Sequence, residues 1–399
     1  MRVCILTETF YPVVGGGETQ TRLLAEGLIA GGHSAMVLTR RSGKSLTKTE
    51  KLGLLEVHRL PPAGEGQLKK WGLLLSSFPF LIRNRREFDL IFVSGFRIVG
   101  VAAVLAGMLF KKSCVLKADS QGEMSGEFFI HGLKKLGIPY TGLLFRSFLR
   151  IRNRVLRNAS AFSAISPDFA DEFIAAGITP HRIHMVPNCV DTDRFYPIDP
   201  AGKDRLREKL GIPRTSKVVI YTGRLVSYKG LPILLIAWKQ ICSRHENALL
   251  LLIGSGGLDI HNCETELKEY VEANQLGEYV RFTGDIQTVS EYLQASDIFV
   301  LPTENDAFPS SLIEAMACRL PIITTPVGAI KTIVSDGVNG KVVHPGDAQQ
   351  LADTLDILLG NPELCAKLGM AAWETVQEYY SADIVTKKYI DLFQQVLDR

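Results

Sequence analysis

The stretch VIYTGRLVSYKG, residues 219–230, decides how this chain folds, because it joins a short apolar run to a turn bounded by Gly223 and Gly230. A stretch of the same kind, ILTETFYPVVGGG at residues 5–17, stands in the first half of the chain. An apolar run, a glycine-bearing turn and a following helix-like segment are typical of parallel α/β structure. The two copies predict two similar units.

Apolar runs alternate with amphipathic segments along the whole chain, and continuous runs of this kind indicate strands buried on both faces. In the first half they lie at 2–7, 34–39, 54–60, 89–95, 113–118, 161–166 and 184–188, and in the second at 218–223, 248–254, 280–284, 297–302, 321–325 and 340–345. The pattern predicts an α/β protein with two Rossmann-like parallel-sheet domains that face each other across a cleft. Ligands are expected at the carboxyl ends of the strands.

The length of 399 residues exceeds what one hydrophobic core usually supports. The stretch 188–205 is rich in Pro and Asp and lacks periodicity, so the joint is expected there. The predicted domains are 1–195 and 196–381. A last helical stretch within 382–399 is compatible with either domain, including packing back on the first.

Composition favours an ordinary globular protein and disfavours nucleic acid as a partner. The formal net charge of +3 gives no strong field for nucleic acid, and the seven cysteines are scattered without a C-x-x-C pair. We therefore expect buried thiols in a reducing compartment. The most apolar later stretch, 98–110, has thirteen residues, whereas a membrane-spanning helix needs about 20. No signal peptide is recognised, so the expected location is cytoplasmic, with peripheral contact at the inner membrane face as a possibility.

Two glycine-rich turns follow strand-like runs, at 13–20 and 250–258. Such a turn at a helix N-terminus lets backbone amides approach a phosphate, although a simple tight turn explains it equally well. The dinucleotide fingerprint G-x-G-x-x-G is absent, and Arg40 and Arg41 stand where a ribose-binding acid is expected. A P-loop is also absent, which disfavours nicotinamide dehydrogenases and P-loop kinases.

Arg224 and Lys229 are two cations on the turn that opens the second half. A guanidinium suits bidentate phosphate binding and an ammonium acts as a point charge, so an anionic partner is expected, with a solvated basic turn as the alternative. The segment TENDAFPSSLIEAMA, residues 303–317, adds Asp306 in a loop and Glu314 in the helix that follows.

This ordered set of motifs resembles the retaining glycosyltransferases of family 4, which have the GT-B fold. The resemblance includes the first-half pattern E-x-F-x-P-x-x-G-G-G from Glu8, the stretch 164–195, and G-R-L-x-x-x-K-G from Gly223. It also includes an acid, seven residues and E-A-M-A from Asp306, and the stretch 325–343. It covers nearly the whole chain.

The resemblance implies roles for named residues. Arg224 and Lys229 match the pair that neutralises the donor diphosphate, Glu314 the acid that binds ribose hydroxyls, and Asp306 the acid that touches the transferred sugar. The implied catalytic residues are Arg224, Lys229 and Asp306. The implied donor-binding set is Gly16, Gly223, Arg224, Lys229, Gly254, Asp306, Phe308, Pro309, Ser310, Ser311 and Glu314. No cofactor or metal is expected to be required.

Three departures from the family pattern affect these roles. Asp306 is one methylene shorter than the usual Glu, Pro309 lacks an amide N–H, and Cys189 replaces the glycine more usual after Asn188. The family's common first-domain histidine is missing, and Asp119 stands in its region. Asp119 either faces the sugar or acceptor or caps the turn that follows it.

The resulting hypothesis is a retaining, metal-independent enzyme that moves a hexose from a nucleotide sugar to a hydroxyl of a glycan or glycolipid. The alternatives are another GT-B chemistry, such as a nucleotide-sugar epimerase, and a catalytically impaired nucleotide-sugar-binding protein or complex partner. Residues 69–86 and 128–157 are basic and apolar together, and 128–157 contains no acid. Contact with an anionic membrane surface or a solvated basic face explains this pattern.

Overall fold

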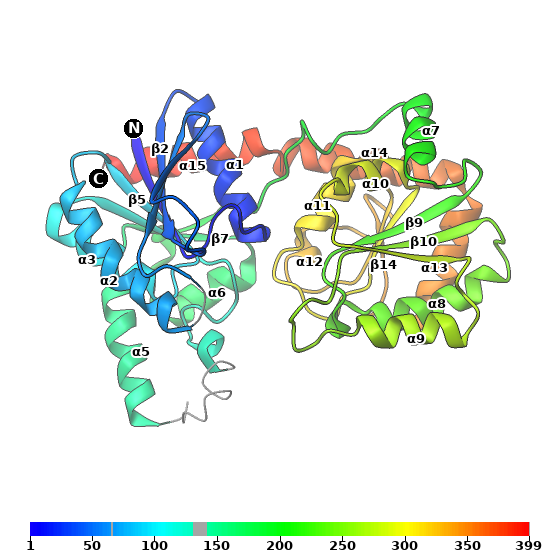
Figure 1. The fold of residues 1–399 in the computed structure, drawn as a ribbon, viewed down its shortest axis with the longest axis horizontal. Helices are drawn as coiled ribbons and strands as arrows, with labels where there is room; N and C mark the ends of the chain where they lie inside the picture. The colour runs from blue at the N-terminus through cyan, green and yellow to red at the C-terminus, as the bar shows by residue number, and fades with distance from the viewer. Residues whose placement is uncertain (65–66, 131–141, 399) are drawn as a thin grey trace. The chain divides into compact units, whose positions relative to one another are not determined.

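The computed structural model describes residues 1–64, 67–130 and 142–398. It divides into two compact units (Figure 1). The first combines residues 1–188 with 382–399, and the second spans 189–381. The predicted boundary followed Phe195, whereas the structure divides the chain after Asn188.

The first unit is built on an eight-stranded sheet in the order β3-β4-β2-β1-β5-β6-β7-β8. Its strands are β1 (Arg2–Thr7), β2 (Ser34–Arg40), β3 (Thr49–Leu52), β4 (Leu55–Leu60), β5 (Leu90–Ser94), β6 (Ser113–Lys117), β7 (Ala161–Ala164) and β8 (Ile183–Met185). All neighbours pair in parallel except β3, which runs antiparallel to β4. The chain goes outward from β1 through β2 and then returns to β5 on the other side of β1. The ends of β1 and β5 therefore form the topological switch point of this sheet.

Helices connect these strands and cover the sheet. They are α1 (Gly16–Ala30), α2 (Gln67–Arg83), α3 (Val99–Phe110), α5 (Leu143–Leu156), α6 (Pro167–Ala175) and α15 (Ala382–Leu397), with a short 3₁₀ turn η1 (Pro180–Arg182). Helix α15 comes from the other end of the chain and contacts α1 and β6. Its red ribbon lies beside the blue ribbon of α1 in Figure 1. Its Tyr389 bonds to Ser163 at 3.1 Å, and its Phe393 ring lies 5.5 Å from that of Phe92.

The second unit contains a six-stranded sheet, entirely parallel, in the order β11-β10-β9-β12-β13-β14. Its strands are β9 (Lys217–Thr222), β10 (Ala248–Ile253), β11 (Val280–Gly284), β12 (Ile298–Leu301), β13 (Ile322–Thr324) and β14 (Lys341–Val342). The central strands are fully enclosed, since all six residues of β10 and all four of β12 are buried. This burial explains their continuous apolar sequences.

Helices connect the strands of the second unit, and some of them begin at a capping residue. They are α7 (Pro200–Lys209), α8 (Leu231–Cys242), α9 (Glu264–Ala273), α10 (Val289–Ala295), α11 (Ser310–Ala317), α12 (Ile330–Ile333), α13 (Ala348–Gly360) and α14 (Pro362–Tyr379), with a 3₁₀ turn η2 (Ser227–Lys229). Asp199 caps α7 by accepting a bond from Gly202, and Asn361 caps α14 in the same way. In both helices a proline at the first position fits the amide-poor first turn.

The structure confirms the predicted class of two parallel α/β units. It adds β3, whose polar sequence TEKL gave no strand signal. All seven cysteines are free, and six of them are buried. The predicted cleft between domains stays a prediction.

Candidate active site

The two motif-bearing loops of the second unit leave neighbouring strands. Strand β9 pairs with β12, and the loops after them carry Arg224 and Asp306 respectively. From β9 the chain moves to β10 on one side and later returns to β12 on the other. These loops therefore diverge at the topological switch point, where open α/β sheets bind ligands.

The turn after β9 is fixed by its own backbone and by Tyr221. The buried Tyr221 hydroxyl donates to the Arg224 carbonyl at 2.7 Å, and Leu225 and Val226 are fully buried. Gly230 ends the turn with φ +73°, and a Cβ there would lie 1.9 Å from the Pro302 carbonyl oxygen. Only glycine fits at this second glycine position of the motif, because the loop after β12 approaches it so closely.

Arg224 projects from this rigid turn, and 61% of its side-chain surface is exposed. Its guanidinium pairs with the Asp259 carboxylate and donates to the Tyr228 hydroxyl at 2.8 Å. Asp259 belongs to the loop after β10. The diphosphate-binding cation that the family resemblance implies is therefore already bound to an acid.

Lys229 and Asp306 form the second ion pair of the site. Only 15% and 12% of the two side chains are exposed, so the pair is held in largely dry surroundings. The acidic loop is anchored by Thr303, whose hydroxyl donates to the Tyr228 carbonyl at 3.1 Å. The loop also passes Gly328, where a Cβ would lie 1.8 Å from the Asp306 carbonyl oxygen. The short Asp306 side chain reaches Lys229 from this constrained backbone.

Helix α11 presents its N-terminus at the end of the same loop. Pro309 stands at the N-cap, so the first helical amides, those of Ser310 and Ser311, receive no capping bond from its side chain. Helix N-termini favour negative charge. Phe308, just before the cap, is buried against Tyr380, with ring centroids 6.0 Å apart.

Glu314 lies one turn into α11 and is partly buried. Burial raises the pKa of its carboxyl to about 7, and the nearby Arg194 opposes this rise. The carboxyl is thus poised to change its protonation near neutral pH. In either form it has oxygen atoms that accept hydrogen bonds from hydroxyl groups.

Glycines make room at the ends of β9 and β10. Gly223 has φ +148° and Gly254 has φ +125°, and a Cβ on Gly254 would lie 2.1 Å from the Gly223 carbonyl oxygen. The two backbones therefore touch directly beside Arg224. Both predicted glycine positions lie at this edge of the sheet.

Gly16 and Asp119, the two predicted residues of the first half, belong to the first unit. Gly16 is the first residue of α1, and a Cβ there would meet no atom within 4 Å. Packing inside the unit therefore does not require glycine at this position. The suggestion that it makes room for a phosphate stays a prediction.

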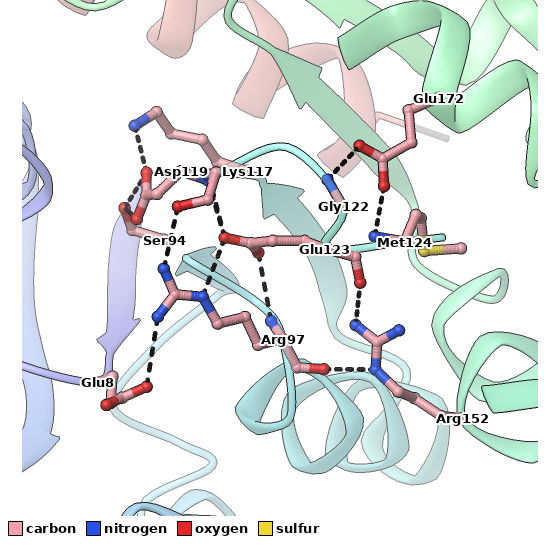
Figure 2. Close-up of polar contacts among 11 residues, drawn as sticks. Glu8, Ser94, Arg97, Lys117, Asp119, Gly122, Glu123, Met124, Arg152 and Glu172 are labelled. Atoms are coloured by element: carbon pink, nitrogen blue, oxygen red, sulfur yellow. Dashed lines mark hydrogen bonds and ion pairs between the residues drawn. The ribbon is translucent and has the colours of Figure 1, made fainter. Parts of the chain in front are cut away.

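Asp119 follows β6 and lies next to the first turn of α1. Its carboxylate accepts hydrogen bonds from Ser94 at 2.9 Å and Lys117 at 2.7 Å (Figure 2). A Cβ on Gly95 would lie 3.0 Å from the same carboxylate, and a Cβ on Gly17 would lie 3.4 Å from it. The carboxylate therefore fills a space that two glycines leave open.

Other carboxylates hold the turn after Asp119. Glu123 accepts from the amides of Asp119 and Ser120, and Glu172 accepts from those of Gly122 and Met124. The Asp119 side chain therefore does not cap the turn that follows it, which was one of its two predicted roles. A role toward sugar or acceptor stays a prediction.

Arg97, after β5, joins the switch-point ends of the first sheet. Figure 2 shows its guanidinium between Glu8, at 3.7 Å, and the fully buried Glu123, at 3.3 Å. Burial raises the pKa of Glu123 to about 7, and Arg97 opposes that rise. This network was not predicted from the sequence.

The structure thus gathers the predicted second-half residues at one edge of one sheet, while Gly16 and Asp119 lie in the other unit. Sequence reasoning missed Asp259, Tyr228 and Arg194. Asp259 lies just past the glycine-rich turn 250–258, and Tyr228 lies within the basic turn itself. Closeness to these two turns was the sequence signal that could have identified Asp259 and Tyr228. Arg194 had no comparable signal.

Comparisons with known proteins agree with this arrangement. Residues 202–375 match the family described as "Glycosyl transferases group 1", and residues 15–189 match "Glycosyl transferase 4-like domain". D-inositol 3-phosphate glycosyltransferase of Corynebacterium aurimucosum is 32% identical over 213 residues, which cover 52% of this chain and 50% of that protein. The match thus spans about half of that relative's length.

Two solved structures cover nearly the whole chain. Sucrose-phosphate synthase from Thermosynechococcus elongatus has a TM-score of 0.78 with 22% identity and covers 100% of both chains. HepE of Anabaena, solved in complex with UDP-glucose, has a TM-score of 0.76 with 21% identity and covers 98% of this chain and 99% of its own. At such identities the likeness establishes the fold. With both halves matched by glycosyltransferase families, the chain belongs to the glycosyltransferases of family 4 type and has the GT-B fold.

Proposed function

We propose that this protein transfers a hexosyl group, with retention of configuration, from a nucleotide diphosphate sugar to a hydroxyl of a glycan or glycolipid. The observation that carries the proposal is the pairing of β9 with β12. It brings the cations Arg224 and Lys229 to the same sheet edge as Asp306 and Glu314.

The reaction requires stabilisation of charge that appears on the departing diphosphate while the sugar becomes oxocarbenium-like. Arg224 and Lys229, with the first amides of α11, supply positive charge to such an oxygen from fixed positions. Stabilising a charge that develops only in the transition state lowers the activation barrier directly. Glu314 accepts the ribose hydroxyls, and Asp306 contacts the sugar.

Metal independence forms part of the proposal, because Arg224 and Lys229 place two cations at the site where the diphosphate is proposed to bind. Retention rests on the family resemblance alone. HepE, which shares the fold, was solved with UDP-glucose, so a UDP-sugar is the first donor to test.

The test is thermal unfolding of the protein with UDP, GDP, ADP or NAD, beside Arg224→Ala. A ligand at 100 times its dissociation constant stabilises the native state by about 2.7 kcal/mol, and each kcal/mol raises the midpoint of a unit of this size by roughly 2–4 °C. We expect one nucleoside diphosphate to give this shift and Arg224→Ala to abolish it. Transfer by the variant should fall by about 10²–10³.

Arg244→Ala is the matched control. Arg244 is also an exposed arginine of the second unit and pairs with Asp356 at 3.1 Å, but it lies on the α8–α13 side. It should leave the nucleotide shift unchanged. A shift produced by NAD alone, or an equal shift in Arg224→Ala, would contradict the proposal.

A second candidate is a nucleotide-sugar-binding protein with impaired catalysis. The ion pair between Asp306 and Lys229 favours it, because the carboxylate assigned to the sugar is already bound. Such a protein binds the donor but neither hydrolyses nor transfers it. Donor turnover with and without acceptor separates the two candidates.

The proposed acceptor side includes contact with an anionic membrane surface through α2 and α5. The Trp71 and Phe148 rings, one from each helix, lie 5.8 Å apart, so the two predicted segments adjoin. Leu143 and Leu144 are 82% and 90% exposed. Residues 131–141 of the predicted segment lie outside the described residues. Among the described residues, no helix is long and apolar enough to cross a membrane.

A further inference from the structure

A cavity of about 510 Å³ lies in the second unit at the sheet edge opposite the candidate active site. The residues at or just before the starts of β9, β12 and β13 line it, whereas Arg224 and Asp306 follow strand ends. Helix α7, the end of α13 and the first turn of α14 complete the walls. This volume lies in the range of small-molecule sites. None of the predicted donor-binding residues contributes to it.

The walls of this cavity, which we call the basal cavity, are strongly cationic. Its basic residues are Lys203, Arg207, Arg214, Lys217 and Arg319, and its only acidic lining residue is Asp297. The Asp297 carboxylate is shared, since it accepts from Lys203 at 2.6 Å and from Arg207 at 2.7 Å. One negative charge thus serves two cations.

Two further lining cations have no acidic partner within residues 1–64, 67–130 and 142–398, which the structure describes. The Lys217 ammonium donates to the carbonyl oxygen of Leu359 at 2.7 Å, which satisfies one N–H but supplies no negative charge. Arg319 is exposed, and among the described residues its guanidinium forms no hydrogen bond or ion pair. Arg214, by contrast, pairs with Glu208 at 2.8 Å. The cavity therefore has a surplus of at least two positive charges.

The remaining walls are apolar or neutral. Leu358 and Leu359 are buried side chains at the end of α13. Cys365 adds a thiol whose pKa burial raises to about 11, so it lines the cavity as a neutral group. The first turn of the 18-residue helix α14 also faces the cavity, and a helix N-terminus favours an anion.

We propose that the basal cavity binds a small organic phosphate, with its charge bound by lining cations that include Lys217 and Arg319 and its apolar part against Leu358 and Leu359. A phosphate monoester carries about −1.5 to −2 charges at pH 7, which matches two cations without a negative partner. A carboxylate supplies only one. This site is separate from the proposed donor site and does not depend on the proposed reaction.

Phenyl phosphate, inorganic phosphate and phenol are suitable probes, because each of the last two lacks one half of the proposed ligand. Calorimetric titration uses the full chain with Arg224→Ala, which removes the principal guanidinium of the donor site. We expect phenyl phosphate to bind, inorganic phosphate to bind more weakly, and phenol not to bind.

Arg319→Asn tests the cation in that background, because Asn tolerates the positive φ of 63° at this position. Lys217→Gln removes the other charge and keeps a donor for the Leu359 carbonyl. Hydrogen bonds to charged groups contribute enough that each change should weaken phenyl phosphate binding about tenfold. Lys367→Asn, an exposed cation of α14 that does not line the cavity, should leave binding unchanged.

Three results would overturn the inference. One is that phenyl phosphate binds to the parent chain but not to the Arg224→Ala variant, which would assign the binding to the donor site. Another is that phenol binds as tightly as phenyl phosphate. The third is unchanged affinity in both folded variants, Arg319→Asn and Lys217→Gln, with folding checked by the thermal midpoint.

Discussion

At the scale of single residues, Asp259 should compete with the diphosphate of the proposed donor for the Arg224 guanidinium. The Asp259 carboxylate pairs with the guanidinium and also accepts a hydrogen bond from the backbone amide of His261 at 3.0 Å. Because Arg224 is 61% exposed, solvent screens the pair, and pairs of this kind contribute only about 0.2–1 kcal/mol. Asp259 therefore opposes donor binding weakly.

Asp259→Asn should tighten UDP binding by about two- to fivefold, because it removes the competing charge and keeps an oxygen for the His261 amide. Calorimetric titration with UDP measures the change. Asp336→Asn, an exposed acid of the same unit that bonds the Val342 amide, is the matched control and should have no effect. Weaker UDP binding in Asp259→Asn would show that Asp259 supports the donor instead of competing with it.

Residues within one motif could be predicted from the sequence, whereas residues brought together by the fold could not. Arg224 and Lys229 lie five positions apart on one turn, and Asp306 precedes Glu314 by eight. Asp259 joins Arg224 from 35 positions away, and Arg194 influences Glu314 from another loop. No local pattern encodes such a contact, because it depends on which strands become neighbours.

At the scale of elements, the strands that could be predicted are those buried on both faces. Strand β10 is a continuous run of buried Ala, Leu and Ile, and it was recognised. Strand β3 is exposed or half-buried along its length, and an ion pair from its Glu50 to the buried Arg59 of β4 helps to hold it. Strand β3 forms because it pairs with β4 at the sheet edge, which its polar sequence does not indicate.

Helix α5 contains one basic residue that does not belong to its exposed face. The predicted basic face contained Arg152, but this side chain points inward and donates to the carbonyls of Arg97 and Glu123, each at 2.5 Å. Burial lowers its pKa to about 10. Arg150 and Arg154 are exposed, beside the 67% exposed Ile151. The exposed face thus remains both basic and apolar.

For this reason Arg150→Gln with Arg154→Gln should reduce binding to anionic liposomes. Each basic residue near such a surface contributes about 1 kcal/mol, so the double change should weaken partitioning roughly 30-fold at low salt. Flotation of the 399-residue chain with anionic and with neutral vesicles measures this. Arg205→Gln with Lys367→Gln removes the same charge from the second unit and should leave flotation unchanged. No co-migration of the parent protein at low salt would exclude the membrane contact.

At the scale of the whole molecule, the chain leaves the first unit after Asn188 and returns to it at Ala382. Helix α15 therefore belongs to the core of the first unit, although it follows the second in sequence. Phe393 is fully buried there, beside Phe92 and Tyr389. The sequence left this packing open, because an amphipathic pattern indicates that a helix packs but not which surface it packs on.

Phe393→Ala should consequently destabilise the first unit and leave the second intact. Removing a buried phenylalanine costs about 3–5 kcal/mol, which lowers the denaturation midpoint of the unit that contains it. Denaturation with and without UDP assigns the transitions, since UDP bound to the second unit, as proposed, should stabilise that unit. Leu397→Ala, at the 37% exposed end of the same helix, should change stability by less than about 1 kcal/mol. A different result would be that the midpoint of the UDP-sensitive transition falls together with that of the other. The two units would then unfold as one cooperative body, and the location of α15 would not decide which part of the chain it stabilises.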